Sequence, residues 1–175
     1  MELWYEYKRF MIIDLDTHQG NNYDNDHTDK EKFYIFDSDI LTGDKSTKNA
    51  ISMGIEGENN DVEFLAELET KLLVAFDTFK PTFVIYKAGT SCMEGESLGK
   101  FNLSPTGITL RDEMVFSQAL NRKIPILMLL SNGFTKTCAP AIADSISNLV
   151  DKFDLFEDFI PSEKHWQARS LKKRQ

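Results

Sequence analysis

The chain has 175 residues, the length of one domain, and its 41% apolar and 27% charged fractions are ordinary for a soluble globular protein. A formal net charge of −8 argues against direct nucleic-acid binding by the folded body, because phosphate contacts require a basic face. No apolar run approaches the ~20 residues of a membrane-spanning helix, and the N-terminal residues lack the apolar core of a signal peptide. We therefore expect an intracellular protein, in the nucleus or the cytoplasm, with no membrane contact.

Strand-like and helix-like segments alternate along the chain, which predicts an α/β domain with a mainly parallel sheet. Strands are expected over residues 10–16, 33–37, 82–87 and 124–131, with a weaker candidate over 51–55. Three of these strands are nearly continuous apolar runs, which is typical of strands covered on both faces.

Helix start signals lie between the predicted strands. Asn60 and Glu63 have the spacing of a capping box, and Pro81 ends the helix that they begin. Ser104 followed by a proline begins a second helix that runs to about Arg122. A last helix starts at about Thr137, and its apolar residues recur at helical spacing up to position 153.

The periodicity fades after that helix, so we predict a domain over residues 1–153 and a polar, basic tail over 154–175. The basic residues between Lys164 and Arg174 indicate either a solvated tail or a nuclear import signal. Cys92 and Cys138 lie far apart without CxxC spacing, which predicts two free thiols and neither a disulfide framework nor a thiolate zinc site.

Polar residues alternate after the first strand, in the segment FMIIDLDTHQGN. Residues two apart in a strand face the same way, so Asp14, Asp16 and His18 leave the strand together. A carboxylate and an imidazole suit zinc, although a capping Asp and a hydrogen-bonded core His explain the pair equally simply, and two ligands do not complete a catalytic zinc site. Ligands of open parallel sheets bind beyond the carboxyl ends of the strands, so we expect the loops after four strands to surround one site.

Three long segments resemble the class IV histone deacetylases, the histone deacetylase 11 branch, in order from about Phe10 to Val150: IIDLDTHQGN, VIYKAGTSCMEGESLGKFNLSPTGITLRDEMVF and IPILMLLSNGFTKTCAPAIADSISNL. Gln19 and Asn21 favour class IV over other zinc-dependent deacetylases. The resemblance implies the C-terminal half of a deacetylase domain, a partial arginase/deacetylase-like α/β fold with a mainly parallel sheet of about five strands flanked by helices. It also implies a zinc-dependent hydrolase of acyl-lysine amides, acting in chromatin regulation on acyl-lysine proteins.

The resemblance assigns metal sites position by position. Asp16 and His18 fall on the first two zinc ligands, and Ser91 falls on the third, where the family has Asp. Asp14 falls on the acid that holds a structural monovalent cation, K⁺, in relatives. Asp37 and Ser38 fall where relatives complete that cation site, although the following loop is a few residues shorter here.

Several catalytic features of the family are missing. A neutral serine is a poor zinc ligand, and Cys92, Glu94 or Glu96 would replace it only if the loop refolds. Phe134 stands where the family has the Tyr that donates to the oxyanion, and Asn132 replaces a glycine of the same turn. The loss of such a donor costs about 10²- to 10³-fold in rate.

The family's general base comes from a His-His pair upstream of the first ligand loop, and the three histidines of this chain form no pair. A missing base costs about 10²- to 10⁴-fold, so the two losses together predict a penalty of about 10⁴ to 10⁷. We therefore predict little or no activity and a weak or lost zinc site.

Two other functions stay open. One is an active class IV lysine deacetylase or defatty-acylase whose N-terminal half is supplied by another chain or missing from the sequence. The other is a purely structural interaction module. Without the absent half, residues 124–130 form an exposed edge strand, which predicts a protein partner there or a sticky, marginal protein.

Overall fold

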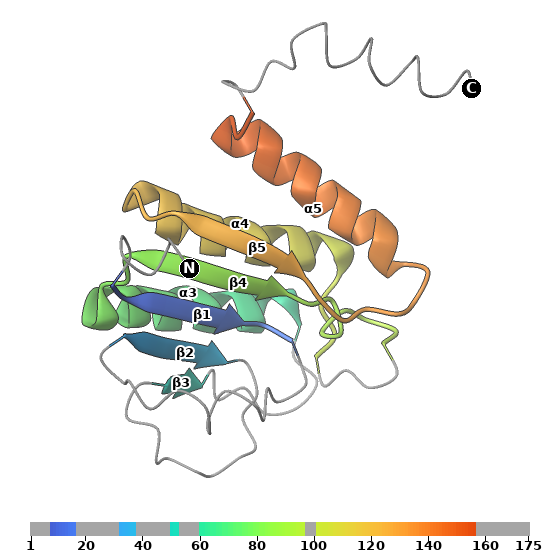
Figure 1. Cartoon of the computed structure of the whole chain (residues 1–175). Coiled ribbons are helices and arrows are strands. Elements are labelled where there is room, and N and C mark those ends of the chain that lie inside the picture. The colour runs from blue at the N-terminus through green and yellow to red at the C-terminus, as the bar shows by residue number, and fades with distance from the viewer. Residues whose placement is uncertain (1–7, 17–31, 38–49, 53–59, 97–100, 157–175) are drawn as a thin grey trace, which may run out of the picture.

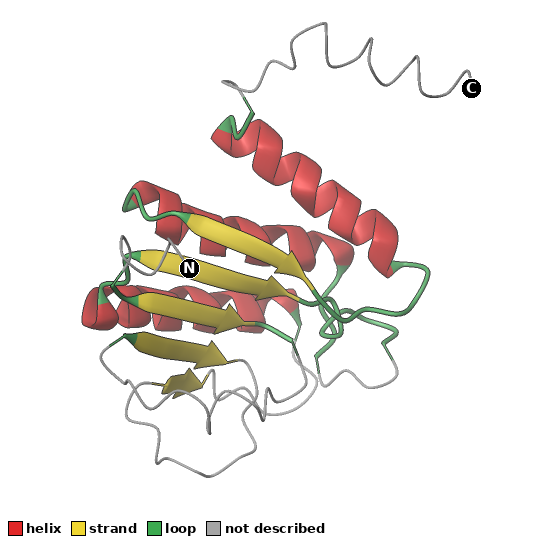
Figure 2. Cartoon of the chain, viewed as in Figure 1, coloured by secondary structure: helices red, strands yellow, loops and turns green. Residues whose placement is uncertain are grey.

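The structure is a computed structural model, and it describes residues 8–16, 32–37, 50–52, 60–96 and 101–156. His18 and Ser38 lie outside these residues, as does most of the predicted tail. The elements appear in Figure 1 and, coloured by type, in Figure 2. In chain order they are β1 (Phe10–Asp14), β2 (Phe33–Asp37), β3 (Ala50–Ser52), α3 (Asp61–Phe79), β4 (Phe83–Ala88), α4 (Pro105–Asn121), β5 (Ile126–Leu130) and α5 (Cys138–Phe153).

The described strands form one five-stranded sheet in the order β3-β2-β1-β4-β5, and every neighbouring pair is parallel. This confirms the predicted parallel α/β architecture. Because β1 lies in the centre, Asp14 at its end is in register with Asp37 of β2 and with Lys87 of β4. The carboxyl ends of β1, β2 and β4 therefore lie at the same level. The polar residues that follow the predicted strands are placed at this end of the sheet.

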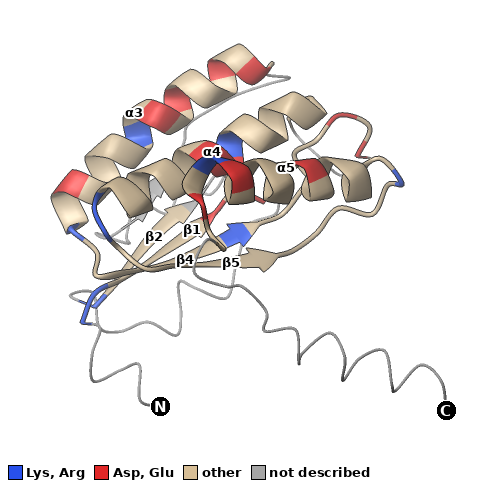
Figure 3. Ribbon diagram, turned by 90° about the horizontal axis from the view of Figure 1, so that it is seen from above, with Lys and Arg blue, Asp and Glu red and all other residues tan. Residues whose placement is uncertain are grey.

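The described helices lie on the same side of the sheet, with α3 and α4 over the strands and α5 beside α4 (Figure 3). The helix-facing positions of β4, including Val84 and Tyr86, are fully buried, whereas the alternate positions are half-buried. On β5, Leu127 and Leu129 are 46% and 44% exposed. The expectation that the apolar strands are covered on both faces is therefore wrong for β5, since the described helices pack against one face only.

The predicted capping signals operate as expected. The Asn60 side chain accepts a hydrogen bond from the backbone N–H of Glu63 at 3.2 Å, at the start of α3. The Ser104 side chain accepts one from Gly107 N at 3.0 Å, with Pro105 as the first residue of α4. The backbone N–H of Ser104 also donates to Asp61 Oδ1 at 2.8 Å, which ties the starts of α3 and α4 together.

The strand β5 is the last strand of the described sheet, as the sequence predicted for an exposed edge. Leu130, the last residue of β5, is 57% exposed, so an apolar side chain is exposed at this edge of the described sheet. Natural sheets usually protect such an edge with charged residues, proline or a covering element. None of the helices in the described ranges is both long and apolar enough to cross a membrane.

The exposed edge predicts concentration-dependent self-association of the chain. We expect the Leu127→Lys/Leu129→Lys variant to associate less than the wild type, because charge on an edge strand opposes pairing between chains. Size-exclusion chromatography with light scattering across a dilution series measures this. Leu73→Lys is the matched control, since Leu73 is 41% exposed but lies on α3. A wild-type chain that elutes as a clean monomer at every concentration would contradict the prediction.

Candidate functional site

The candidate site lies at the carboxyl ends of β1, β4 and β5. Asp16 follows β1, Ser91 follows β4 and Asn132 follows β5. Asp14 and Asp16 are both fully buried, and the backbone N–H of Asp16 donates to Asp14 Oδ1 at 3.1 Å. Gly89 allows the β4 loop to approach Asp16, because a Cβ at that position would lie only 3.0 Å from the Asp16 carboxyl carbon. The structure thus brings Asp14, Asp16 and Ser91 together, as the sequence predicted.

The Asp16 carboxylate accepts hydrogen bonds from side chains on both neighbouring loops. The Ser91 hydroxyl donates to Oδ1, and the Asn132 side-chain amide donates to Oδ2. The Lys87 ammonium lies 3.9 Å from Oδ2. Both oxygens of the predicted first zinc ligand therefore face donors or a positive charge supplied by the chain itself.

Lys87 interacts more closely with Asp14. Its Nζ donates to Asp14 Oδ2 at 2.9 Å, and the Lys87 side chain is 25% exposed. Burial raises the pKa of Asp14, and the hydrogen bond and charge of Lys87 oppose that rise. Lys87 is the last residue of the strand predicted over residues 82–87, but this position alone does not indicate a role. Its register partner Asp14 was the available signal, because a parallel sheet places the two side by side.

The described residues at this site do not fit a zinc ion. Zinc is held by thiolate, imidazole or carboxylate ligands, whereas the described side chains that contact the Asp16 carboxylate are a hydroxyl, an amide and an ammonium, and the nearby Asp14 carboxylate accepts a hydrogen bond from that ammonium. The hydroxyl of Ser91 points its proton at Asp16 and so acts there as a donor. Within the ranges that the structure describes, no group of three or more His, Cys, Asp or Glu side chains could hold a metal.

The cation site that the resemblance implies is only partly described. The backbone of Asp37 lies beside Asp14 through the sheet register, while Ser38 lies outside the described residues. At Asp14 the structure places the Lys87 ammonium within hydrogen-bond distance. The roles of Asp14, Asp37 and Ser38 toward K⁺, and of His18 toward zinc, stay predictions.

Two of the three substitutes considered for the third ligand, Cys92 and Glu96, have other partners, and Glu94 is exposed. Cys92 is buried, and its sulfur accepts a hydrogen bond from Arg111 Nη1 at 3.0 Å. Burial raises the pKa of this thiol. Glu96 Oε1 accepts hydrogen bonds from the backbone N–H of Thr135 at 2.8 Å and from Cys138 Sγ at 3.0 Å. Both side chains are thus bound to groups other than Asp16.

Phe134, at the position of the family's catalytic Tyr, is 80% exposed. Its backbone N–H donates to Glu96 Oε1 at 3.1 Å, and its ring has no group that could donate to an oxyanion. The turn before it is tied to the β4 loop, because Asn132 O accepts from Thr90 N at 2.7 Å and from Thr90 Oγ1 at 3.1 Å. Gly133 has φ +136°, a conformation that favours glycine.

A buried network of charged and hydroxyl side chains is hydrogen-bonded to the backbone of the loop that carries Ser91. Arg111 is fully buried and donates from Nη1 to the carbonyl oxygen of Gly89 at 2.6 Å and from Nε to Asp112 Oδ1 at 2.9 Å. Asp112 also accepts hydrogen bonds from the hydroxyls of Tyr86 and Ser145. Burial alone would lower the pKa of Arg111, but the charge of Asp112 contributes to holding it well above its ordinary value.

Sequence reasoning missed this network. Arg111 and Asp112 are adjacent charged residues in a predicted helix, and such pairs usually belong to a solvated face. The nearest signal was their position three and four residues after Ile108, which places them between Ile108 and Val115 on the buried face of α4.

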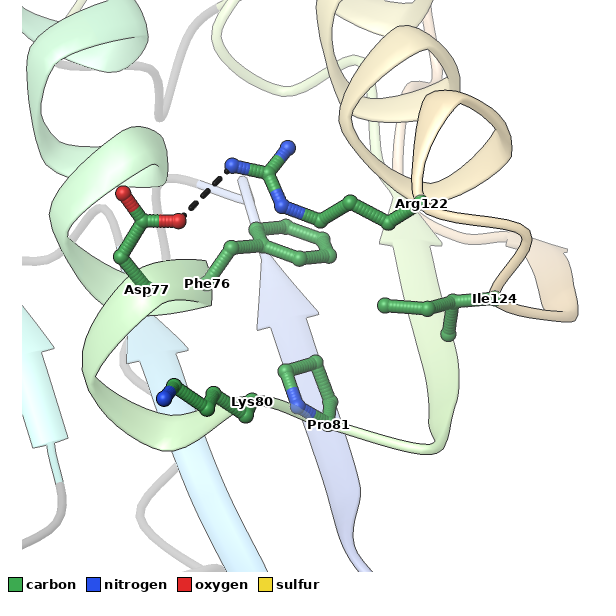
Figure 4. A pocket seen from close by; sticks show the side chains of 6 residues that line it. All are labelled: Phe76, Asp77, Lys80, Pro81, Arg122 and Ile124. Atoms are coloured by element: carbon green, nitrogen blue, oxygen red, sulfur yellow. Dashed lines mark hydrogen bonds and ion pairs between the residues drawn. The ribbon is translucent and has the colours of Figure 1, made fainter.

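A surface pocket of about 540 Å³ lies at the opposite end of the sheet (Figure 4). It is lined by Phe76, Asp77, Lys80, Pro81, Arg122 and Ile124, which precede β4 and β5 or end the helices before them. Arg122 Nη2 pairs there with Asp77 Oδ1 at 3.0 Å, beside the ring of Phe76. The pocket is therefore separate from the strand-end site.

The contacts of Glu96 predict a pH-dependent contribution to stability. Hydrogen bonds from Cys138 and Thr135 lower its pKa from 4.5 to about 2. A carboxylate with a depressed folded-state pKa stabilises the fold above its unfolded pKa, and this stabilisation is lost as the pH falls toward the folded value. We expect the difference in free energy of unfolding between wild type and Glu96→Gln to be constant above about pH 5.5 and to shrink between about pH 4.5 and 2.

Urea unfolding of both proteins at a series of pH values measures that difference. Glu94→Gln is the matched control, because Glu94 is an exposed carboxylate of the same loop. A difference that is independent of pH from 6 to 2 would contradict the assignment of these hydrogen bonds to ionised Glu96.

Comparisons with known proteins agree with this geometry. Residues 2–150 match the family model of the histone deacetylase domain. Histone deacetylase 2 of Arabidopsis thaliana is 44% identical over 147 residues, which cover 81% of this chain and 38% of that protein. The chain therefore spans less than half the length of this relative.

Two solved structures have the same fold. The HDA15 HD domain has a TM-score of 0.68 at 17% identity, covering 97% of this chain and 56% of that one. Acetylpolyamine aminohydrolase from Burkholderia pseudomallei has a TM-score of 0.72 at 12% identity, covering 85% of this chain and 47% of that one. Together with the family model, the parallel sheet and its strand-end site lead to one conclusion: the chain belongs to the histone deacetylase domain family.

Proposed function

We propose that this chain is a class IV, histone deacetylase 11-like member of the family that has little or no acyl-lysine hydrolase activity of its own. The observation that carries the proposal is the hydrogen bond from Ser91 to Asp16, since the residue at the third-ligand position acts as a hydrogen-bond donor to the first ligand. A side chain in this role brings no negative charge to a zinc ion.

Other features support the same function. Phe134 cannot donate to an oxyanion, and its ring is largely exposed. The chain contains no adjacent pair of histidines to serve as general base. Because these losses affect the metal, the oxyanion and the base separately, a compensating change at one of them would not restore turnover. A role in binding an acyl-lysine protein or a deacetylase partner, in the nucleus or the cytoplasm, fits a fold that is kept without its chemistry.

The second candidate is an active deacetylase or defatty-acylase assembled with an N-terminal half from outside this sequence. The position of β5 at the edge of the described sheet and its exposed leucines favour it, because further strands can pair with that edge and further elements can cover the leucines. This candidate still requires hydrolysis without the family's third ligand and catalytic hydroxyl, so we rank it second.

The first test is hydrolysis by the purified chain. We expect no turnover of acetyl-lysine or myristoyl-lysine peptides with added zinc, because the metal, the oxyanion donor and the base are all impaired. Asp16→Ala/His18→Ala is the control, measured in the same assay with mass-spectrometric detection of the free lysine. Turnover by the wild type that disappears in this variant would overturn the proposal and favour the active deacetylase.

The second test separates metal binding from turnover. We expect Ser91→Asp to raise zinc affinity, because it restores a carboxylate at the third-ligand position, and to leave turnover undetectable. Zinc titration by calorimetry measures the first effect and the peptide assay the second. Ser91→Asn, which is of similar size but neutral, is the matched control. Equal zinc affinity in all three proteins would show that Ser91 is not at the third-ligand position.

A further inference from the structure

We propose that the ammonium group of Lys87 is a built-in cation, which together with the Ser91 and Asn132 donors replaces metal ions at the carboxyl ends of the strands. The folding of this end of the sheet is therefore independent of bound metal. The inference deepens the proposed function by saying what replaces the missing ion, but it concerns stability and not turnover.

The first step of the argument is the pair of buried carboxylates. Asp14 and Asp16 both have exposed fractions of 0%, and the backbone N–H of Asp16 donates a hydrogen bond to the Asp14 side chain. Two ionised carboxylates in one buried site are strongly unfavourable unless a positive charge accompanies them. In a metal-binding relative that charge is an ion, so a chain with a poor metal site must obtain it elsewhere.

The second step is the position of Lys87. Its Nζ lies 2.9 Å from Asp14 Oδ2 and 3.9 Å from Asp16 Oδ2, so one ammonium serves both carboxylates. The register of β1 with β4 fixes this arrangement, because Asp14 and Lys87 are direct neighbours across the sheet. The lysine is held by regular secondary structure and does not depend on a loop.

The third step is the neutral donors. Ser91 donates to one oxygen of Asp16 and Asn132 to the other, from the loops after β4 and β5. Hydrogen bonds to a carboxylate stabilise its ionised form. Asp16 thus connects the ends of β1, β4 and β5 through hydrogen bonds to side chains of the same chain. A metal ion with ligands from several loops would connect those loops in the same way.

Thermal unfolding of the full 175-residue chain, followed by circular dichroism, tests the inference. We expect the wild-type midpoint to be the same within about 1 °C in EDTA, in excess Zn²⁺ and in K⁺ or Na⁺ at equal ionic strength, because nothing that binds the native state selectively is added or removed. A midpoint that falls in EDTA, or rises with Zn²⁺ or K⁺, would overturn it.

Substitution of the lysine tests the role of its charge. We expect Lys87→Met to lower the midpoint by about 6 °C or more, because it removes the ammonium group that lies beside both buried carboxylates. Lys71→Met is the matched control, since Lys71 pairs with Glu67 on the surface of α3 at 3.5 Å and should have little effect. Equal effects of the two substitutions would overturn the proposal.

A second pair of variants covers the case in which Lys87→Met does not fold. Lys87→Arg keeps the positive charge and Lys87→Gln removes it while keeping a donor. We expect the midpoint of the Arg variant to lie above that of the Gln variant, and equal midpoints would overturn the role of charge. These experiments measure unfolding and not turnover. An inactive chain that needs a bound ion to fold would therefore overturn this inference but leave the proposed function unaffected.

Discussion

The buried carboxylate of Asp16 is the constraint on which the strand-end site depends. A carboxylate removed from water must be compensated by hydrogen bonds or positive charge, and the cost of leaving it uncompensated is several kcal/mol. Here Ser91, Asn132 and Lys87 meet that requirement from two other strands. A buried carboxylate can meet this need by binding a metal ion, whereas Asp16 meets it here by accepting hydrogen bonds and lying near an ammonium group.

Residues of the β4 loop and of α4 keep these donors in place. Gly89 lets the β4 loop come close to Asp16, and the buried guanidinium of Arg111 holds the carbonyl of Gly89 from the opposite side. Asp112 balances the charge of Arg111 and connects it to Tyr86 of β4 and Ser145 of α5. The loop that carries Ser91 is thus held between two charged groups, one at the site and one in the core.

Most of the fold followed from local signals in the sequence. Apolar runs located the strands, and Asn60 and Ser104 located two helix starts, because capping is decided by a few adjacent residues. The exposure of β5 was harder to predict, since an apolar strand has the same sequence pattern whether or not a second layer of helices covers it. Coverage depends on elements distant in the sequence.

The sequence predicted part of the site, namely Asp14, Asp16 and Ser91, but not the contacts that these residues make. The alternation of Asp14 and Asp16 and the resemblance to deacetylases pointed to the positions that the structure brings together at Asp16. The roles of Lys87 and Arg111 depend on which strand or loop lies beside each, and that is set by sheet register and helix packing. A charged residue without its neighbours gives no indication that it is a counterion.

The shared carboxylate also couples the residues around it, so that changes at positions 91 and 132 do not act independently. An acid at position 91 would face Asp16 and require a cation, whereas a glycine at position 132 would leave Asp16 Oδ2 without its amide donor. Residues in one hydrogen-bond network have non-additive effects. The effects of substitutions at positions 91 and 132 on stability are therefore coupled, because both side chains act on the one carboxylate of Asp16.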